Sequence, residues 1–226
     1  MIVIGFSGVM GSGKTLAADS LAALLQHTGH TCQTFAFADE LKRIARTEFG
    51  WDGEKDAKGR KLLQVLGTEA GRVYNSDIWV EKTANAIRQA ESVAAYDTCH
   101  HEDGTVAMRC ESCGAKFPNA DISASDWEGA CCDDQRLAHD APLFIAILHD
   151  VRFPNEVAWI KEQEQGLVFF LEREGHEGDS HASETSFPPK SKYDATIQNK
   201  GSRKDYEDDV WNMVRRLAIE KGFPTL

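Results

Sequence analysis

The sequence predicts an α/β protein in which a doubly wound parallel sheet is interrupted by a small cysteine-rich insertion. Short apolar runs alternate with stretches of helical character along most of the chain. The run at residues 143–148 is apolar on both faces, as expected of a strand that helices cover on both sides. Five of the six cysteines lie between Cys99 and Cys132, in a segment with few apolar residues. These three observations define the predicted fold class.

The individual elements follow from local patterns. Strands are expected at the apolar runs 2–6, 34–37, 143–148, 167–171 and 195–197. Helices are expected at residues 14–25, 60–66, 78–93, 155–165 and 204–221. A further helix is expected to begin near Asp39, because aspartate is a residue type that caps helices. Leu41, Ile44 and Ala45 would share one face of this helix. Residues 179–192 are polar and contain proline, which predicts a loop.

Composition limits the classes of function. With 226 residues, 42% of them hydrophobic, the chain is long enough for one sizeable core. The formal net charge of -11 argues against a general nucleic-acid-binding surface, which needs many Lys and Arg contacts to phosphates. No window approaches the roughly 20 apolar residues of a membrane span, and no secretory leader is visible. We therefore expect a cytoplasmic protein without a membrane partner (in the host cytoplasm if the chain comes from a phage).

A phosphate-binding motif stands between the first expected strand and helix. Residues 8–15, Gly-Val-Met-Gly-Ser-Gly-Lys-Thr, match the pattern G-x-x-x-x-G-K-[ST] in full. Glycines let the backbone wrap an anion, while the lysine contacts the β- and γ-phosphates of ATP and the threonine hydroxyl ligates Mg²⁺. A chance glycine-rich turn is the alternative. The expected nucleotide contacts are Gly8, Gly11, Ser12, Gly13, Lys14 and Thr15.

A second polar site follows the long apolar strand. Asp150 comes at its carboxyl end, where ligands bind in open α/β sheets. The carboxylate could reach the magnesium shell or orient the acceptor, and Arg152 lies two residues further on. The alternative is an aspartate that serves only the turn.

Several further blocks occur in order. They are Phe-Ala-Asp at 37–39 with Leu-Lys at 41–42, Arg-Lys-Leu-Leu-Gln-Val-Leu-Gly-Thr-Glu at 60–69, Trp-Val at 79–80, Asp-Val-Arg at 150–152 with Asn-Glu at 155–156, His-Ala-Ser-Glu at 181–184 and Ile-Gln-Asn-Lys-Gly-Ser at 197–202. On these blocks and the phosphate loop, the chain resembles the phage-type deoxynucleoside monophosphate kinases, a branch of the P-loop nucleotide kinases. The resemblance covers most of the chain except the cysteine-rich part. It implies transfer of the γ-phosphate of Mg-ATP to a deoxynucleoside 5′-monophosphate, which yields the diphosphate.

The resemblance also suggests which side chains bind the acceptor. Guanidinium groups match phosphate oxygens in pairs, and the alternative for an arginine is a surface ion pair. Contacts to the base or sugar are expected from polar and aromatic side chains. For Asp39, helix capping is an equally good explanation, and for Trp79 a position in the core is the commoner case. The candidate acceptor residues are Asp39, Arg60, Gln64, Thr68, Arg72, Trp79 and Arg152.

A lid and an adenine-binding loop are implied on the other side of the phosphate loop. In related kinases the region after the strand at 167–171 closes over ATP and delivers an arginine, here Arg173. Asn199 and Gly201 belong to the loop that borders the adenine, while His181 and Glu184 are expected to hold the lid. Lys14, Asp150, Arg152 and Arg173 are thus the candidate catalytic residues.

The cysteine-rich segment is expected to bind a structural zinc ion. Residues 94–140 form the insertion, and residues 1–93 with 141–226 form the kinase core with its acceptor-binding helices and lid. The Cys-x-x-Cys-Gly turn that begins at Cys110 resembles half of a zinc ribbon. The expected ligands are Cys99, Cys110, Cys113 and Cys132, with Cys131 or His101 as substitutes. Reduced free cysteines are the alternative, and the module could cover the acceptor site, form an oligomer contact such as a homodimer, or bind a partner.

Two other functions fit parts of the sequence. One is a P-loop kinase for another small acceptor, such as dephospho-coenzyme A. The other is a zinc-ribbon nucleic-acid binder that uses ATP as a switch, which the acidic net charge disfavours.

Overall fold

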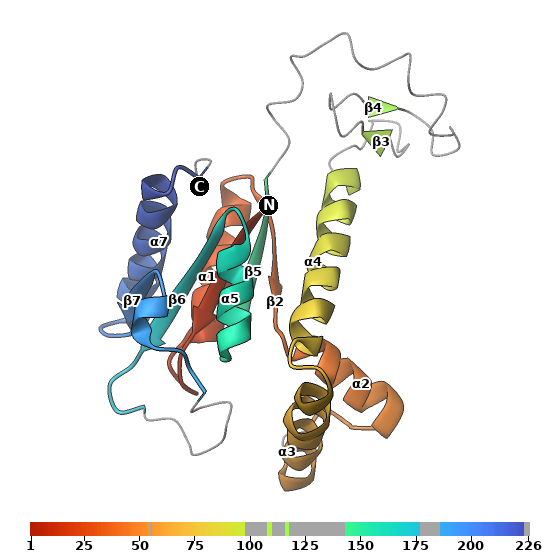
Figure 1. Ribbon diagram of the computed structural model, residues 1–226. Coiled ribbons are helices and arrows are strands. Elements are labelled where there is room, and N and C mark those ends of the chain that lie inside the picture. Colours follow the sequence, from red (N-terminus) through yellow and green to blue (C-terminus); the bar gives the residue numbers. More distant parts are fainter. Residues whose placement is uncertain (55, 98–107, 110–115, 118–142, 177–185, 224–226) are drawn as a thin grey trace.

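A five-stranded, fully parallel sheet forms the centre of the molecule in this computed structural model (Figure 1). The strands lie in the order β2-β5-β1-β6-β7, and every neighbouring pair is parallel. The structure describes residues 1–54, 56–97, 108–109, 116–117, 143–176 and 186–223. This sheet confirms the predicted fold class.

The strands of the sheet are β1 (Ile2–Ser7), β2 (Thr31–Phe35), β5 (Phe144–Val151), β6 (Gly166–Glu172) and β7 (Ala195–Gln198). A two-stranded antiparallel pair consists of β3 (Met108–Arg109) and β4 (Lys116–Phe117). The helices are α1 (Lys14–His27), α2 (Asp39–Phe49), α3 (Ala57–Gln64), α4 (Ile78–Asp97), α5 (Pro154–Glu162) and α7 (Arg203–Glu220), with a π-helix η1 (Val65–Arg72) and a 3₁₀ turn η3 (Lys190–Lys192).

Two apolar layers cover the two faces of the sheet. Along β1, Ile2, Ile4 and Phe6 pack with α1 and α7, while Val3 faces the layer that contains α4 and α5. This alternation reflects the opposite directions of successive side chains in a strand. All six residues of β1 are buried, so this strand is the axis of the core. Figure 1 shows α1 and α7 together on one side and α5 and α4 toward the other.

Helices α2 and α3 lie beyond the sheet, at the end where the phosphate loop is found (Figure 1). Helix α3 runs directly into η1, which makes the i→i+5 hydrogen bonds of a π-helix. Gly67 within η1 is buried against Leu41 of α2, and its carbonyl accepts a hydrogen bond from Trp79 Nε1 at 2.9 Å. The bulged turn is therefore held by packing on one side and by a tryptophan on the other.

Some predicted boundaries are wrong, for identifiable reasons. The expected strand 34–37 begins earlier, and Ala36 and Phe37 belong to the turn that follows β2. Asp39 is the first residue of α2, and the N-cap of this helix is Ala38. The Asp39 carboxylate accepts a hydrogen bond from the Ala36 N–H at 2.8 Å. The helix expected at 60–66 begins earlier, at Ala57, and continues into η1. The prediction missed η1 because a π-helix has no signature in the spacing of apolar residues.

The cysteine cluster that begins at Cys99 lies outside the described residues, so the insertion boundaries and the zinc ligands stay predictions. Within the part of the chain that the structure describes, no group of three or more His, Cys, Asp or Glu side chains is arranged to hold a metal ion. None of the described helices is long and apolar enough to cross a membrane.

The sheet predicts a clear contrast between two isoleucine-to-alanine substitutions. Ile147 in β5 is fully buried, whereas Ile219 in α7 is 57% exposed. Ile147→Ala should lower the free energy of unfolding by about 2–5 kcal/mol, because it removes buried methyl groups and leaves a cavity. Urea unfolding followed by circular dichroism measures this loss. Ile219→Ala is the control and should change stability by less than about 1 kcal/mol; equal losses in both would contradict the assigned core.

Candidate active site

The phosphate loop connects the carboxyl end of β1 to the amino end of α1. Gly8, Gly11 and Gly13 have positive φ angles of 140°, 82° and 103°, which residues with a side chain rarely adopt. A Cβ on Gly8 would also collide with the Leu171 carbonyl, and one on Gly13 with the Asn199 side chain. The glycines at these positions are thus required by the backbone path.

The interior of the loop is suited to an anion. Lys14 is only 8% exposed, and its Nζ donates to the carbonyl oxygens of Gly8 and Val9 at 2.6 and 2.7 Å. The hydroxyl of Ser12 is fully buried and has no hydrogen-bond partner among the described residues. A buried hydroxyl without a partner is costly, and phosphate oxygens would satisfy it. The first turn of α1 adds its N–H groups and the positive end of its dipole, so these residues fit the phosphates of ATP, with Thr15 placed in the same turn for Mg²⁺.

Side chains from the end of the chain support the loop. Asn199 follows β7, and its Nδ2 donates to the Ser12 carbonyl at 2.9 Å. Tyr206 of α7 is fully buried, and its hydroxyl donates to the Gly13 carbonyl at 3.3 Å. Burial raises the pKa of Tyr206 well above its ordinary value, which keeps this hydroxyl protonated as a donor. Gly201, by contrast, lies in the turn that leads into the Ser202 cap of α7, with a positive φ of 76°.

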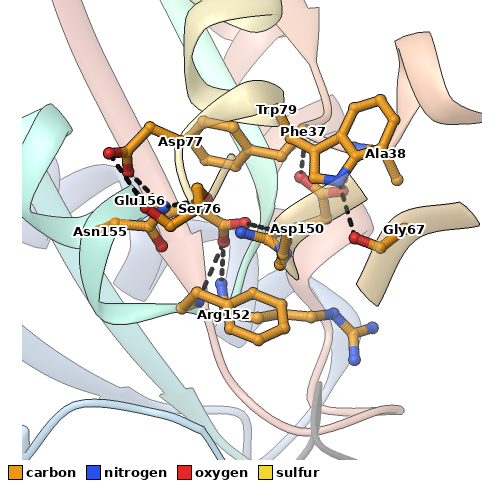
Figure 2. A network of polar contacts seen from close by, with 12 residues as sticks. Phe37, Ala38, Gly67, Ser76, Asp77, Trp79, Asp150, Arg152, Asn155 and Glu156 are labelled. Carbon is orange, nitrogen blue, oxygen red and sulfur yellow. Dashed lines mark hydrogen bonds and ion pairs between the residues drawn. The ribbon is translucent and has the colours of Figure 1, made fainter. Parts of the chain in front are cut away.

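Asp150 fixes the turn between β2 and α2. Its two carboxylate oxygens accept the backbone N–H groups of Phe37 and Ala38 at 2.8 and 3.1 Å (Figure 2). The strands β2 and β5 are neighbours in the sheet, so this contact joins two adjacent carboxyl ends. In this conformation the carboxylate positions the amino end of α2, beside the site where the sequence places the acceptor.

The first turn of α5 contains the most deeply buried acidic side chain of the site. Glu156 is 1% exposed and accepts the N–H groups of Arg152 and Phe153 at 2.7 and 3.0 Å. Its other oxygen accepts a hydrogen bond from the Arg72 guanidinium at 2.5 Å. The Arg72 guanidinium carbon also lies 3.8 Å from the centre of the Phe153 ring, which is a cation–π contact. Arg72 is therefore held on two sides.

The electrostatics of Glu156 are unusual for a carboxyl group in an ion pair. Its pKa is raised to about 7, mainly by burial and also by the nearby charge of Asp150. Arg72 and the two backbone N–H groups act in the opposite direction. Burial prevails because the side chain has almost no contact with water.

A second attachment joins the same two segments. Asn155 Nδ2 donates to the Ser76 carbonyl at 2.9 Å and to Asp77 Oδ1 at 2.8 Å (Figure 2). The start of α5 is thus tied twice to the segment between η1 and α4. These contacts bridge residues about 80 positions apart in the chain.

Two features of the site were not expected from the sequence. Tyr193, between η3 and β7, places its hydroxyl 3.1 Å from Ser7 Oγ at the end of β1. Burial raises the pKa of Tyr193, and the negative charge of Glu156 raises it further. His176 lies against Gly11 of the phosphate loop, which leaves no room for a side chain there. Neither residue belongs to a recognisable motif, so the sequence offered no signal for them.

The remaining candidates divide by exposure. Gln64 and Thr68 are half-buried on α3 and η1, whereas Arg60 on α3 and Arg173 beyond β6 are exposed. Trp79 is 4% exposed and uses its indole N–H for Gly67, so it lies in the core with little surface left for a base. His181 and Glu184 lie outside the described residues.

A separate hollow of about 440 Å³ lies at the opposite end of the sheet. Thr31 and Phe144, which begin β2 and β5, line it together with Val93 of α4. Ligands of open α/β sheets bind at the carboxyl ends of strands. This hollow is therefore distinct from the phosphate loop and the Glu156 turn.

A phosphate loop between the first strand and first helix of a doubly wound parallel sheet defines a P-loop nucleotide-binding fold. No family model matches the chain. The comparison with curated proteins finds no match either.

Among solved structures, TT1252 from Thermus thermophilus is 16% identical, with a TM-score of 0.42 over 97% of each chain. APE1195 is 13% identical, with a TM-score of 0.38 over 96% of this chain and 95% of that one. Shikimate kinase from Acinetobacter baumannii, in complex with shikimate, is 13% identical, with a TM-score of 0.39 over 98% and 95%. Likenesses this slight carry no argument about activity, which rests on the residues of this chain.

The raised pKa of Glu156 predicts a pH dependence of stability. Below its ordinary pKa of 4.5 the group is neutral in both the folded and unfolded chain, so its stabilising contribution is complete. That contribution is lost as the pH rises through about 7, where the folded protein must ionise a buried acid. Relative to Glu156→Gln, the wild-type protein should lose roughly 3 kcal/mol between pH 4.5 and pH 8. Urea unfolding of both proteins across this range measures the difference; a constant difference would contradict the raised pKa.

Proposed function

We propose that this protein is a kinase that transfers the γ-phosphate of Mg-ATP to a deoxynucleoside 5′-monophosphate. The observation that supports phosphoryl transfer most directly is the phosphate loop. Inside it lie the buried ammonium of Lys14 and the Ser12 hydroxyl, which has no hydrogen-bond partner among the described residues. Phosphoryl transfer needs little covalent chemistry from the protein. It needs positioning and positive charge around a transition state with dispersed negative charge.

The acceptor side of the proposal rests on the arginines. Arg72 and Arg152 lie at the turn after β5. Since β5 is the neighbour of β1, this turn lies near the carboxyl end of β1, where the phosphate loop starts. A guanidinium binds two phosphate oxygens at once, which orients a monophosphate for in-line attack. The resemblance noted in the sequence supports a deoxynucleotide as the carrier of that phosphate.

In this proposal each part of the chain has a distinct task. Lys14 binds the β- and γ-phosphates and neutralises the charge that develops during transfer. Mg²⁺, held through the Thr15 hydroxyl, would polarise the transferring phosphoryl group. Asp150 keeps the β2–α2 turn in place through its two amide contacts and could orient the acceptor through that turn. Arg173, after β6, is suited to approach the phosphates from the opposite side.

The substrate is identified by a product survey. Radiolabelled Mg-ATP is incubated with each common nucleoside and deoxynucleoside monophosphate, and with dephospho-coenzyme A, before chromatography. Labelled deoxynucleoside diphosphates are expected. Label in dephospho-coenzyme A alone would assign the protein to another class of P-loop kinase. Label released only as inorganic phosphate, together with salt-sensitive DNA binding, would indicate an ATP-switched nucleic-acid binder.

Substitution of the loop lysine tests the phosphate loop itself. Lys14→Ala should lower kcat/KM at least about a hundredfold, because it removes the cation that contacts the transferring phosphates. The circular dichroism spectrum should remain that of the wild-type protein. Lys204→Ala is the matched control, because its side chain is 83% exposed on α7 and forms a surface ion pair with Asp208, one helical turn away. Near-normal turnover by Lys14→Ala would overturn the assignment.

A further inference from the structure

We infer that Glu156 is a positioning residue that holds the Arg72 guanidinium ready for the phosphate of the acceptor. The inference rests on the proposed function and deepens it. It assigns binding of the acceptor phosphate to Arg72. It also implies that protonation of the Glu156 carboxylate weakens this binding. Figure 2 shows the Glu156 carboxylate bonded within the β5–α5 turn, while the neighbouring Asn155 is bonded to Ser76 and Asp77.

Two contacts hold the Arg72 guanidinium and leave some of its N–H donors without a partner among the described residues. Glu156 takes one N–H of the guanidinium at 2.5 Å, and the Phe153 ring lies 3.8 Å from its central carbon. Within the described part of the chain, the bond to Glu156 is the only hydrogen bond of the Arg72 side chain. A guanidinium has five N–H donors, and this side chain is only 15% exposed. None of its nitrogens is both buried and without a partner among the described residues, so the remaining donors face solvent. An anion that enters from solvent, such as a phosphate, would suit these donors.

A purely structural ion pair explains these observations less well. Buried ion pairs often contribute little net stability, because desolvation offsets the attraction. Here burial raises the pKa of Glu156 to about 7, so the fold is working against the charge that pairs with Arg72. The second tether between the same segments, from Asn155 to Ser76 and Asp77, already fastens the backbone without any buried charge.

The charged and titratable groups around Glu156 come from three elements. Arg72 belongs to η1, Asp150 to β5, and Tyr193 lies in the segment before β7. Of these, Arg72 favours the ionised carboxylate, whereas Asp150 opposes it. Protonation of Glu156 removes the charge that holds Arg72 on its inner side. Of the two contacts, only the Phe153 ring then holds the guanidinium, which is no longer oriented toward the acceptor phosphate.

The test is steady-state kinetics of Glu156→Gln between pH 6 and pH 8.5. At pH 8 the KM for the deoxynucleoside monophosphate should rise about 10- to 100-fold, which is the usual effect of losing one charge-assisted hydrogen bond. The KM for ATP should change by less than about twofold, because the phosphate loop is untouched. The ratio of acceptor KM values, variant to wild type, should fall toward one as the pH falls below 7, where Glu156 is neutral in the wild-type protein as well. Protonation of the acceptor phosphate affects both proteins equally and cancels in this ratio.

Asn155→Ala is the matched control. It breaks the other tether between the same two segments and leaves the Arg72 pair intact. Its acceptor KM should stay within about threefold of the wild-type value, and its pH profile should follow the wild type. Equal KM changes in Glu156→Gln and Asn155→Ala, or a variant-to-wild-type ratio that does not depend on pH, would overturn the inference in favour of a structural role.

A second variant keeps the test decisive if Glu156→Gln does not fold. Arg72→Lys preserves a positive charge beside Glu156 but removes the planar pair of donors. It should raise the acceptor KM about tenfold with the ATP KM unchanged; a normal acceptor KM would overturn the inference. Wild-type protein that phosphorylates no monophosphate overturns the proposed function and this inference together. Wild-type turnover with unaltered variants overturns the inference alone.

Discussion

The segment from the end of β5 to the start of α5 is the constraint on which the rest of the site depends. Within seven residues it supplies three attachments to distant segments. Asp150 holds the β2–α2 turn, Asn155 holds the start of α4, and Glu156 holds Arg72 at the end of η1. All three partners lie outside the sheet, on the part of the chain from which an acceptor would be bound. The sheet itself fixes this turn, because β5 is the neighbour of both β1 and β2.

The two halves of the site are built in different ways. The phosphate loop is local, since its glycines, its lysine and the helix behind it are contiguous in sequence, and Asn199 and Tyr206 only brace it. The proposed acceptor half is assembled from segments about 80 residues apart, and its central contact is a carboxyl group whose charge the interior disfavours. Proteins generally accept such a cost where position matters more than stability.

This difference explains how much could be predicted from the sequence. The parallel sheet and the phosphate loop were predictable, because apolar runs and the glycine pattern are local signals. The π-helix η1 was not, since its single-residue shift leaves no mark in the apolar spacing. Arg72 was named from the resemblance, but its partner Glu156 was noted only as part of a block. Tyr193 and His176 reach the site through tertiary folding alone.

In the proposed function, one edge of the sheet binds a nucleoside triphosphate and a nucleoside monophosphate side by side. Calorimetric titration with a bisubstrate ligand, adenosine joined to a deoxynucleoside through a chain of phosphates, tests it most directly. Such a ligand spans both halves of the site. It loses rotational and translational entropy once, whereas two separate ligands lose it twice. The predicted result is one molecule bound per chain, with an affinity well above those of Mg-ATP and of the monophosphate. An affinity no greater than that of Mg-ATP alone would contradict a shared edge.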